Sequence, residues 1–120
     1  YGPEGIAFES EDVFFEYDQA TLTPESRNLL QKKAAFLLKH PEVQITIEGH
    51  CDQRGSSDYN LGLGQRRADS IKYYLMDLGV PGNRMATVSY GKEQPLDPGY
   101  GEEAWARNRR GHLVMGGLND

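Results

Sequence analysis

Residues 47–68 read IEGHCDQRGSSDYNLGLGQRRA, and this stretch decides how the rest of the chain is arranged. It begins at the end of a strand in which apolar and polar residues alternate, passes through a polar loop that contains glycine, and continues into a long helix. Backbone amides of such a loop and of the first helical turn point outward, which makes a strand-to-helix junction a natural ligand site. We therefore expect the functional site at this junction.

The segments on either side predict an α/β (α+β) two-layer sandwich. Strands are expected at residues 12–17, 43–49, 85–90 and 111–115, and helices at 24–40, 56–79 and 102–110. Thr23, Pro24 and Glu25 form a typical helix start, and Gly79 is a typical C-terminal cap. This order of elements predicts a mixed four-stranded sheet with two main helices and a short third helix on one face.

A single domain accounts for the chain, because 120 residues are enough to bury a core. Residues 1–11 carry glycines and a proline without periodicity and are expected to be an N-terminal tail, residues 12–116 the domain, and residues 117–120 a C-terminal tail. The predicted buried side chains are Val13, Phe15 and Tyr17, then Leu29, Leu30, Ala34, Leu37 and Leu38, then Ala68, Ile71, Leu75 and Leu78. Gly62 and Gly64 inside the second helix indicate close packing, a close ligand or a frayed first turn, at about 1 kcal/mol each relative to alanine.

Composition argues against several functions. The formal net charge of -5 provides no basic field to attract nucleic-acid phosphates. No apolar run approaches the roughly 20 residues of a membrane span. The single cysteine, Cys51, has no partner for an intramolecular disulfide. Consecutive residues of an extended segment point to opposite sides, so the run His50-Cys51-Asp52 is not expected to chelate a metal, and we expect no cofactor.

Asp52, Asn60 and Arg67 are the candidate binding residues. Asn60 and Arg67 are seven positions apart and share a face of the predicted helix, while Asp52 precedes them in a loop able to fold over that face. A carboxylate accepts from an ammonium group, a guanidinium donates two hydrogen bonds to a carboxylate, and an amide orients both. The set predicts a receptor for a zwitterionic amino-acid head group. The alternative is that Asp52 and Arg67 simply pair with each other.

Several motifs of the chain resemble those of the OmpA-like domain. They are Glu48-Gly49-His50-Cys51-Asp52-Gln53-Arg54-Gly55-Ser56, Tyr59-Asn60, Leu63-Gly64-Gln65-Arg66-Arg67-Ala68, the run VSYGKEQP at 88–95, and Asn108-Arg109-Arg110. The resemblance covers about residues 12–115 and, within the superfamily, is strongest to the peptidoglycan-associated lipoproteins (Pal). It implies non-covalent binding of the diaminopimelate residue of uncrosslinked peptidoglycan stem peptides. It also implies a position at the periplasmic face of the outer membrane, a lipid on an upstream cysteine, and TolB as a partner in the Tol–Pal system.

The same resemblance implies roles for individual residues. Asp52 would take the ammonium group and Arg67 the carboxylate, while Asn60, Asp18 and the backbone near Cys51 would line the same pocket. For Asp18 the structural alternative is a turn cap. Cys51 departs from the family, which usually has threonine or alanine there. This is harmless if the position acts through its backbone, and it weakens binding if a hydroxyl is needed.

Two other functions stay open. A hydrolase would use His50 as a base beside Asp52, but the sequence shows no recognisable nucleophile–base–orienter spacing. A stator or porin C-terminal domain of the same superfamily would differ only in its tether. We expect binding without catalysis, with Arg66, Arg109 and Arg110 in structural ion pairs. Asp52→Ala and Arg67→Ala are expected to abolish retention on purified sacculi while leaving the fold intact.

Overall fold

The strands form one mixed sheet in the order β1-β4-β2-β3. The computed structural model describes residues 1–116, in which β1 is Val13–Phe14, β2 is Ile45–His50, β3 is Met85–Gly91 and β4 is Arg110–Met115. Strand β2 pairs in parallel with β3 and antiparallel with β4, and β1 pairs antiparallel with β4. The predicted mixed four-stranded sheet is confirmed.

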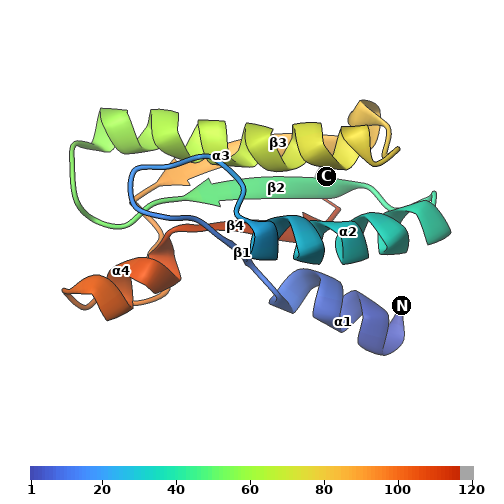
Figure 1. The fold of residues 1–120 in the computed structure, drawn as a ribbon, viewed down its shortest axis with the longest axis horizontal. Coiled ribbons are helices and arrows are strands. Elements are labelled where there is room, and N and C mark those ends of the chain that lie inside the picture. The colour runs from blue at the N-terminus through green and yellow to red at the C-terminus, as the bar shows by residue number, and fades with distance from the viewer. Residues whose placement is uncertain (117–120) are drawn as a thin grey trace.

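The helices pack mainly on one side of this sheet. They are α1 (Gly2–Ser10), α2 (Pro24–Lys39), α3 (Ser57–Asp77) and α4 (Glu102–Asn108), with a short 3₁₀ turn, η1 (Gly82–Arg84), before β3. Figure 1 shows α2 and α3 running side by side along the strands, whereas α4 lies beside the end of the sheet. The fold class is therefore as predicted, except that α4 does not cover the face of the sheet and α1 is an additional helix. Within residues 1–116, none of the helices has the length and apolar character needed to cross a membrane.

One apolar core lies between the sheet and these helices. Strand β2 alternates as predicted, with Ile45 and Ile47 fully buried and Glu48 on the opposite face. Helix α2 begins as predicted, because the hydroxyl of Thr23 accepts a hydrogen bond from the amide of Ser26 (3.1 Å). The buried members of the core are Phe8, Val13, Phe15, Leu30, Ala34, Phe36, Leu37, Val43, Ile45, Ile47, Ala68, Ile71, Leu75, Val80, Met85 and Leu113.

The first eleven residues are not the expected tail, because residues 2–10 form α1 and pack against α2 and β4. Phe8 is buried and stacks on Phe36 of α2, with ring centroids 4.9 Å apart. Lys33 is also buried and donates to the backbone carbonyl of Phe8, and burial lowers the pKa of its ammonium group to about 8. Because α1 covers this side of α2, Phe36 and Lys33 are buried, while Leu38, predicted to face inward, is 49% exposed. Residues 117–120, expected to be a C-terminal tail, lie outside the described residues.

The first strand is shorter than predicted and ends before Tyr17. Val13 and Phe15 are buried as expected, but Tyr17 is 56% exposed. The reason is that the chain leaves the sheet after Phe15 and turns toward α3, where Arg67 donates to the carbonyls of Glu16 (3.1 Å) and Gln19 (2.8 Å). In Figure 1 this blue loop between β1 and α2 arches in front of the carboxyl end of β2. The loop thereby brings residues 16–19 to the junction predicted to hold the site.

Two histidines, His50 and His112, lie on the sheet face opposite the core, and their pKa values are shifted in opposite directions. Burial lowers the pKa of His50, whose Nε2 lies 3.0 Å from Glu48 Oε1. A hydrogen bond with Asp12 (2.7 Å) raises the pKa of His112. The negative charge of Glu48 also raises this pKa, and the positive charge of Arg110 lowers it. Below its ordinary pKa of about 6.5, His50 therefore costs stability, since only the unfolded chain takes up its proton readily.

We expect His112→Gln to lose more stability in acid than in base. The stabilisation from protonated His112 is fully present below its unfolded pKa and disappears as pH rises through its higher folded pKa. The loss should be roughly 0.5–1 kcal/mol at pH 5.5 and close to zero at pH 8.5, measured by urea unfolding. In an Asp12→Asn background the pH dependence of this loss should shrink. An equal loss at both pH values would contradict the role given to the His112–Asp12 pair.

Candidate functional site

A cavity of about 120 Å³ opens where β2 ends and α3 begins. All five residues predicted from the sequence line it, and they come from three separate segments of the chain. The lining residues are Tyr17, Asp18, Cys51, Asp52, Arg54, Gly55, Tyr59, Asn60, Leu63 and Arg67. The predicted convergence of an acid after the second strand with a guanidinium of the next helix is therefore present.

Arg67 forms the floor of the cavity and is only 1% exposed. Its guanidinium donates to three backbone carbonyls, those of Glu16 (3.1 Å), Gln19 (2.8 Å) and His50 (2.9 Å). Burial lowers the pKa of Arg67, but a guanidinium stays charged. Among residues 1–116 it forms no ion pair with a carboxylate. A buried guanidinium without an ion-pair contact therefore lines the cavity, and the charges of Asp52 and Asp18 act on it from nearby.

Asp52 does not pair with Arg67, which removes the simplest structural alternative. Its carboxylate accepts from the backbone amide and Nε of Arg54 (3.1 Å each) and from Arg54 Nη2 (2.8 Å), and Arg109 Nη1 lies 3.6 Å away. Burial alone would raise the pKa of Asp52, but the hydrogen bonds from Arg54 outweigh it and hold the pKa below its ordinary value. The carboxylate is 5% exposed and already compensated by Arg54.

Arg54 is held between two aromatic rings. The carbon of its guanidinium lies 3.9 Å from the ring centroid of Tyr17 and 4.0 Å from that of Trp105 in α4. Stacking and the two hydrogen bonds to Asp52 fix the guanidinium in one orientation. The result is a wall built from the loop before α2, the loop before α3, and α4.

Asn60 and Cys51 shape the cavity without adding charge. The amide of Asn60 donates to the carbonyls of Arg54 (2.8 Å) and Ser56 (2.9 Å), which folds the loop back on the start of α3. The thiol of Cys51 is buried and lies 3.3 Å from the carbonyl oxygen of Asn60, and burial raises its pKa. A neutral, buried thiol is a poor nucleophile, so Cys51 fills space here.

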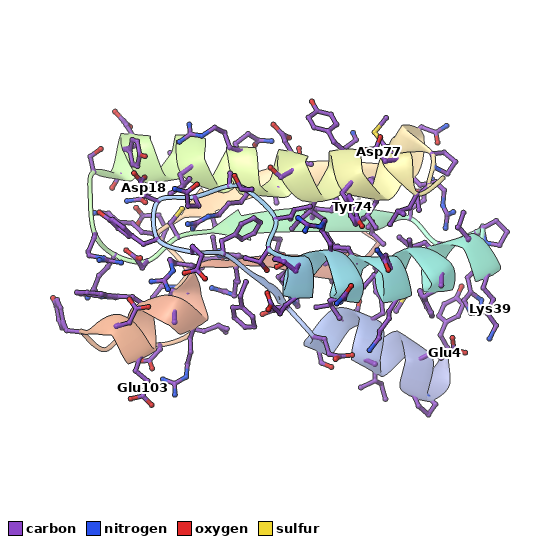
Figure 2. The ribbon with its side chains drawn as sticks, in the orientation of Figure 1. Glu4, Asp18, Lys39, Tyr74, Asp77 and Glu103 are labelled. Atoms are coloured by element: carbon purple, nitrogen blue, oxygen red, sulfur yellow. The ribbon has the colours of Figure 1, made fainter. Side chains whose placement is uncertain are left out.

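Asp18 is the free acid at the rim of the cavity. It lies on the loop beside the first turns of α3 (Figure 2) and accepts a hydrogen bond from the hydroxyl of Tyr59. Its φ of 55° places it in the left-handed region, which aspartate tolerates better than most residues. Within residues 1–116 it forms no ion pair with a lysine, arginine or histidine. Its charge is available to a ligand.

Sequence reasoning missed four side chains at this site. Tyr17 was assigned to the core, Trp105 to packing and Arg109 to a structural ion pair, while Arg54 was noted only as part of a motif. Arg109 does pair with Glu102 (2.7 Å), but it also approaches Asp52. A useful signal was available in Arg54 itself, because an arginine two residues after an acid in a tight loop can pair with it. No spacing rule could place Trp105, which lies 51 residues further along the chain.

A larger cavity of about 510 Å³ lies beside β1 and the start of α2. Its lining is mainly apolar and acidic, and its buried guanidinium, Arg109, is already paired with Glu102 at 2.7 Å. The smaller cavity is the better candidate, because its buried guanidinium, Arg67, forms no ion pair within residues 1–116, whereas that of the larger cavity is paired. Such a site is suited to bind a small zwitterion and holds no activated nucleophile.

Known proteins resemble this chain over most of its length. The sequence model of the OmpA family matches residues 14–109. The chain is 46% identical over 105 residues to the peptidoglycan-associated lipoprotein of Rhizobium meliloti (strain 1021), and 43% identical over 100 residues to that of Pseudomonas aeruginosa. These alignments cover 88% and 83% of this chain but only 60% and 59% of the relatives, so the chain spans about three fifths of their length.

Solved structures give the same result. The crystal structure of the peptidoglycan-associated lipoprotein from Burkholderia pseudomallei superposes with a TM-score of 0.86 at 42% identity, covering 89% of this chain and 91% of that one. The C-terminal domain of Helicobacter pylori MotB has a TM-score of 0.82 at 22% identity, over 91% and 86% of the two chains, and shows the shared fold alone. With an alternating strand, a glycine-containing junction and a long helix arranged as in these relatives, the chain belongs to the OmpA family.

Proposed function

We propose that this protein binds peptidoglycan non-covalently by holding the zwitterionic end of a diaminopimelate side chain in the cavity at the β2–α3 junction. The observation that carries the proposal is the pair of uncompensated charges there, Arg67 at the floor and Asp18 at the rim. A diaminopimelate side chain ends in one ammonium and one carboxylate on the same carbon. A positive charge at the floor and a negative charge at the rim of a small cavity complement that group.

The two acids of the site have different tasks in this proposal. Asp18 offers its charge directly to the ammonium group, because no cation of the described chain neutralises it. Asp52 is engaged by Arg54 and Arg109, so it acts first by fixing those two guanidinium groups and contributes to the ammonium only through a remaining lone pair. The initial assignment of the ammonium to Asp52 is thus extended to Asp18.

Binding of this kind would anchor the outer membrane to the cell wall. The relatives are named peptidoglycan-associated lipoproteins, which supports a periplasmic position and a lipid attached upstream of residue 1. By the same resemblance we propose TolB as a protein partner within the Tol–Pal system. The second candidate function is that of a C-terminal domain attached to a stator or a porin, because the C-terminal domain of MotB shares this fold.

Catalysis fits the site less well than binding. His50, the residue a hydrolase would use as its base, is buried on the sheet face opposite the core, with its Nε2 engaged by Glu48. The thiol of Cys51 is buried and protonated at neutral pH. Mass spectrometry of muropeptides incubated with the protein would reveal new products if this view is wrong.

Asp18→Asn is expected to weaken binding of a diaminopimelate stem peptide about 10-fold or more without loss of stability. Asparagine tolerates the left-handed backbone and still accepts from Tyr59, so only the charge is removed. Titration calorimetry with the diaminopimelate peptide measures the effect, and its lysine counterpart, which lacks the side-chain carboxylate, is the control ligand. Equal affinity of the wild type for both peptides would refute recognition of the zwitterion.

A further inference from the structure

We infer that the binding site continues beyond the zwitterion cavity into a second subsite, in which Arg66 binds a further carboxylate of the same stem peptide. The inference rests on the proposed function and names a contact that this function does not require. The second subsite is the open depression lined by Ala20, Thr21, Arg66, Asp69, Ser70 and Tyr73, with a volume of about 410 Å³.

The first supporting observation is that Arg66 is an exposed guanidinium without a polar partner. Sequence reasoning expected a structural ion pair here, but among residues 1–116 it forms no ion pair and no side-chain hydrogen bond. The guanidinium lies over the ring of Tyr59, whose centroid is 5.8 Å from the guanidinium carbon. Five N–H donors are therefore available to a ligand.

Arg66 lies between the zwitterion cavity and the depression, because it contacts Tyr59 of the cavity and lines the depression. The hydroxyl of Tyr59 donates to Asp18 at the rim of the zwitterion cavity, while the ring of the same tyrosine lies under Arg66. Tyr59 and Arg66 are seven residues apart on α3, as are Asn60 and Arg67, so two parallel rows of side chains run along this helix. Tyr59, Asn60 and Arg67 line the zwitterion cavity, whereas Arg66 lines the depression, so the row of Tyr59 and Arg66 runs from one to the other.

The second supporting observation is Gly62, which lies inside α3 between Tyr59 and Arg66. Glycine in a helix interior is destabilising relative to alanine, so its presence calls for a packing reason. No backbone approaches Gly62, and a Cβ there would meet only Nη1 of Arg66, at 3.4 Å. The missing side chain therefore leaves room for the guanidinium to lie back along the helix, over Tyr59.

Two hydroxyl groups of the lining suit an anionic group, whereas the carboxylate of Asp69 opposes one. Thr21 and Ser70 supply hydroxyl donors on either side of the depression. Asp69, the acid of the lining, accepts from Gln65 at 2.9 Å. A stem peptide carries a suitable second anion, since its γ-linked glutamate, adjacent to diaminopimelate, keeps a free α-carboxylate. With the diaminopimelate end held by Arg67 and Asp18, the carboxylate of the neighbouring glutamate is the group that we assign to Arg66.

The test is a titration of two stem peptides that differ only at this carboxylate, one with free glutamate and one with the α-carboxylate amidated. Wild-type protein is expected to prefer the free acid about 10-fold, and Arg66→Gln to bind both peptides equally, at the weaker affinity. Arg66→Lys should keep part of the preference. Gly62→Ala should reduce the preference while leaving the helix intact, because it displaces the guanidinium.

Lys72→Gln is the matched control, since it removes one positive charge from the same helix away from both hollows and should keep the full preference. If wild type binds both peptides equally while Asp18→Asn still weakens them, the second subsite is refuted and the zwitterion site stands. If Lys72→Gln and Arg66→Gln weaken binding alike, the effect is general electrostatics and the subsite is also refuted. If wild type binds neither peptide, both proposals fail.

Discussion

Arg67→Ala is expected both to abolish binding of the diaminopimelate peptide and to destabilise the domain by about 3–5 kcal/mol. Reasoning from the sequence alone expected the fold to survive this change intact. The structure requires a correction, because the guanidinium is buried and bonds the carbonyls of Glu16, Gln19 and His50. Removing it leaves those three carbonyls without donors and creates a cavity where the 15–23 loop meets β2 and α3.

Loss of binding must therefore be separated from loss of structure. Arg67→Lys keeps the charge but loses the fork of donors, so we expect intermediate stability and at least a 10-fold loss of affinity. Arg67→Met keeps most of the volume and removes the charge, so affinity should fall about 10- to 150-fold, since a charged hydrogen bond contributes about 1.5–3 kcal/mol. Urea unfolding gives the free energy of unfolding, and circular dichroism identifies the temperature at which each variant is folded for the titration.

The outcome for Arg67→Met decides the role of the charge. A folded Arg67→Met protein that binds the peptide within threefold of wild type would show that the guanidinium supports only the loop. Asp52→Asn provides a comparison at the same site, because it releases Arg54 and Arg109 and leaves Arg67 in place. We expect it to lose about 1–3 kcal/mol of stability.

The convergence of Asp52, Asn60 and Arg67 was predictable because it depends on local geometry. A strand ends at a known residue, a loop follows, and two helical turns separate Asn60 from Arg67, so the periodicity of one helix fixes their relative positions. The positions of β2, β3 and β4 and the boundaries of α2 and α3, to within two residues, were predictable for the same reason, whereas β1 is shorter than predicted. Their apolar periodicity is regular, and Thr23 and Ser56 accept from the amides that their N-cap positions predict.

What the sequence did not reveal depends on contacts between distant segments. Helix α1 escaped prediction because only Gly5 and Phe8 of its residues are buried, so the helix has no apolar stripe. Tyr17 follows two apolar positions in alternation, and only the bonds from Arg67 to the following loop turn it away from the core. The stacking of Trp105 on Arg54 joins two loops and a helix, which no local pattern describes.

Gly64→Ala and Gly62→Ala are expected to change stability in opposite directions, although the two positions are two residues apart in the same helix. A Cβ at Gly64 would overlap Ser89 Oγ and lie 2.9 Å from the carbonyl oxygen of Gly49 on β2. The backbone of β2 has no room to move away, so we expect Gly64→Ala to cost at least about 3 kcal/mol. Gly62→Ala meets only the flexible Arg66 side chain and should gain up to about 1 kcal/mol.

Urea unfolding of the two single variants measures both effects, and Gly49→Ala tests the same contact from the strand, since a Cβ there would overlap the carbonyl of Gly64. Gly49→Ala is expected to prevent folding. Ser89→Ala combined with Gly64→Ala should recover only part of the loss, because the carbonyl of Gly49 remains in the way. Equal stability of Gly64→Ala and Gly62→Ala would show that α3 can shift on the sheet. The shift would also move Arg67 relative to His50, so the close approach at Gly64 fixes the position of the guanidinium that the proposed ligand requires.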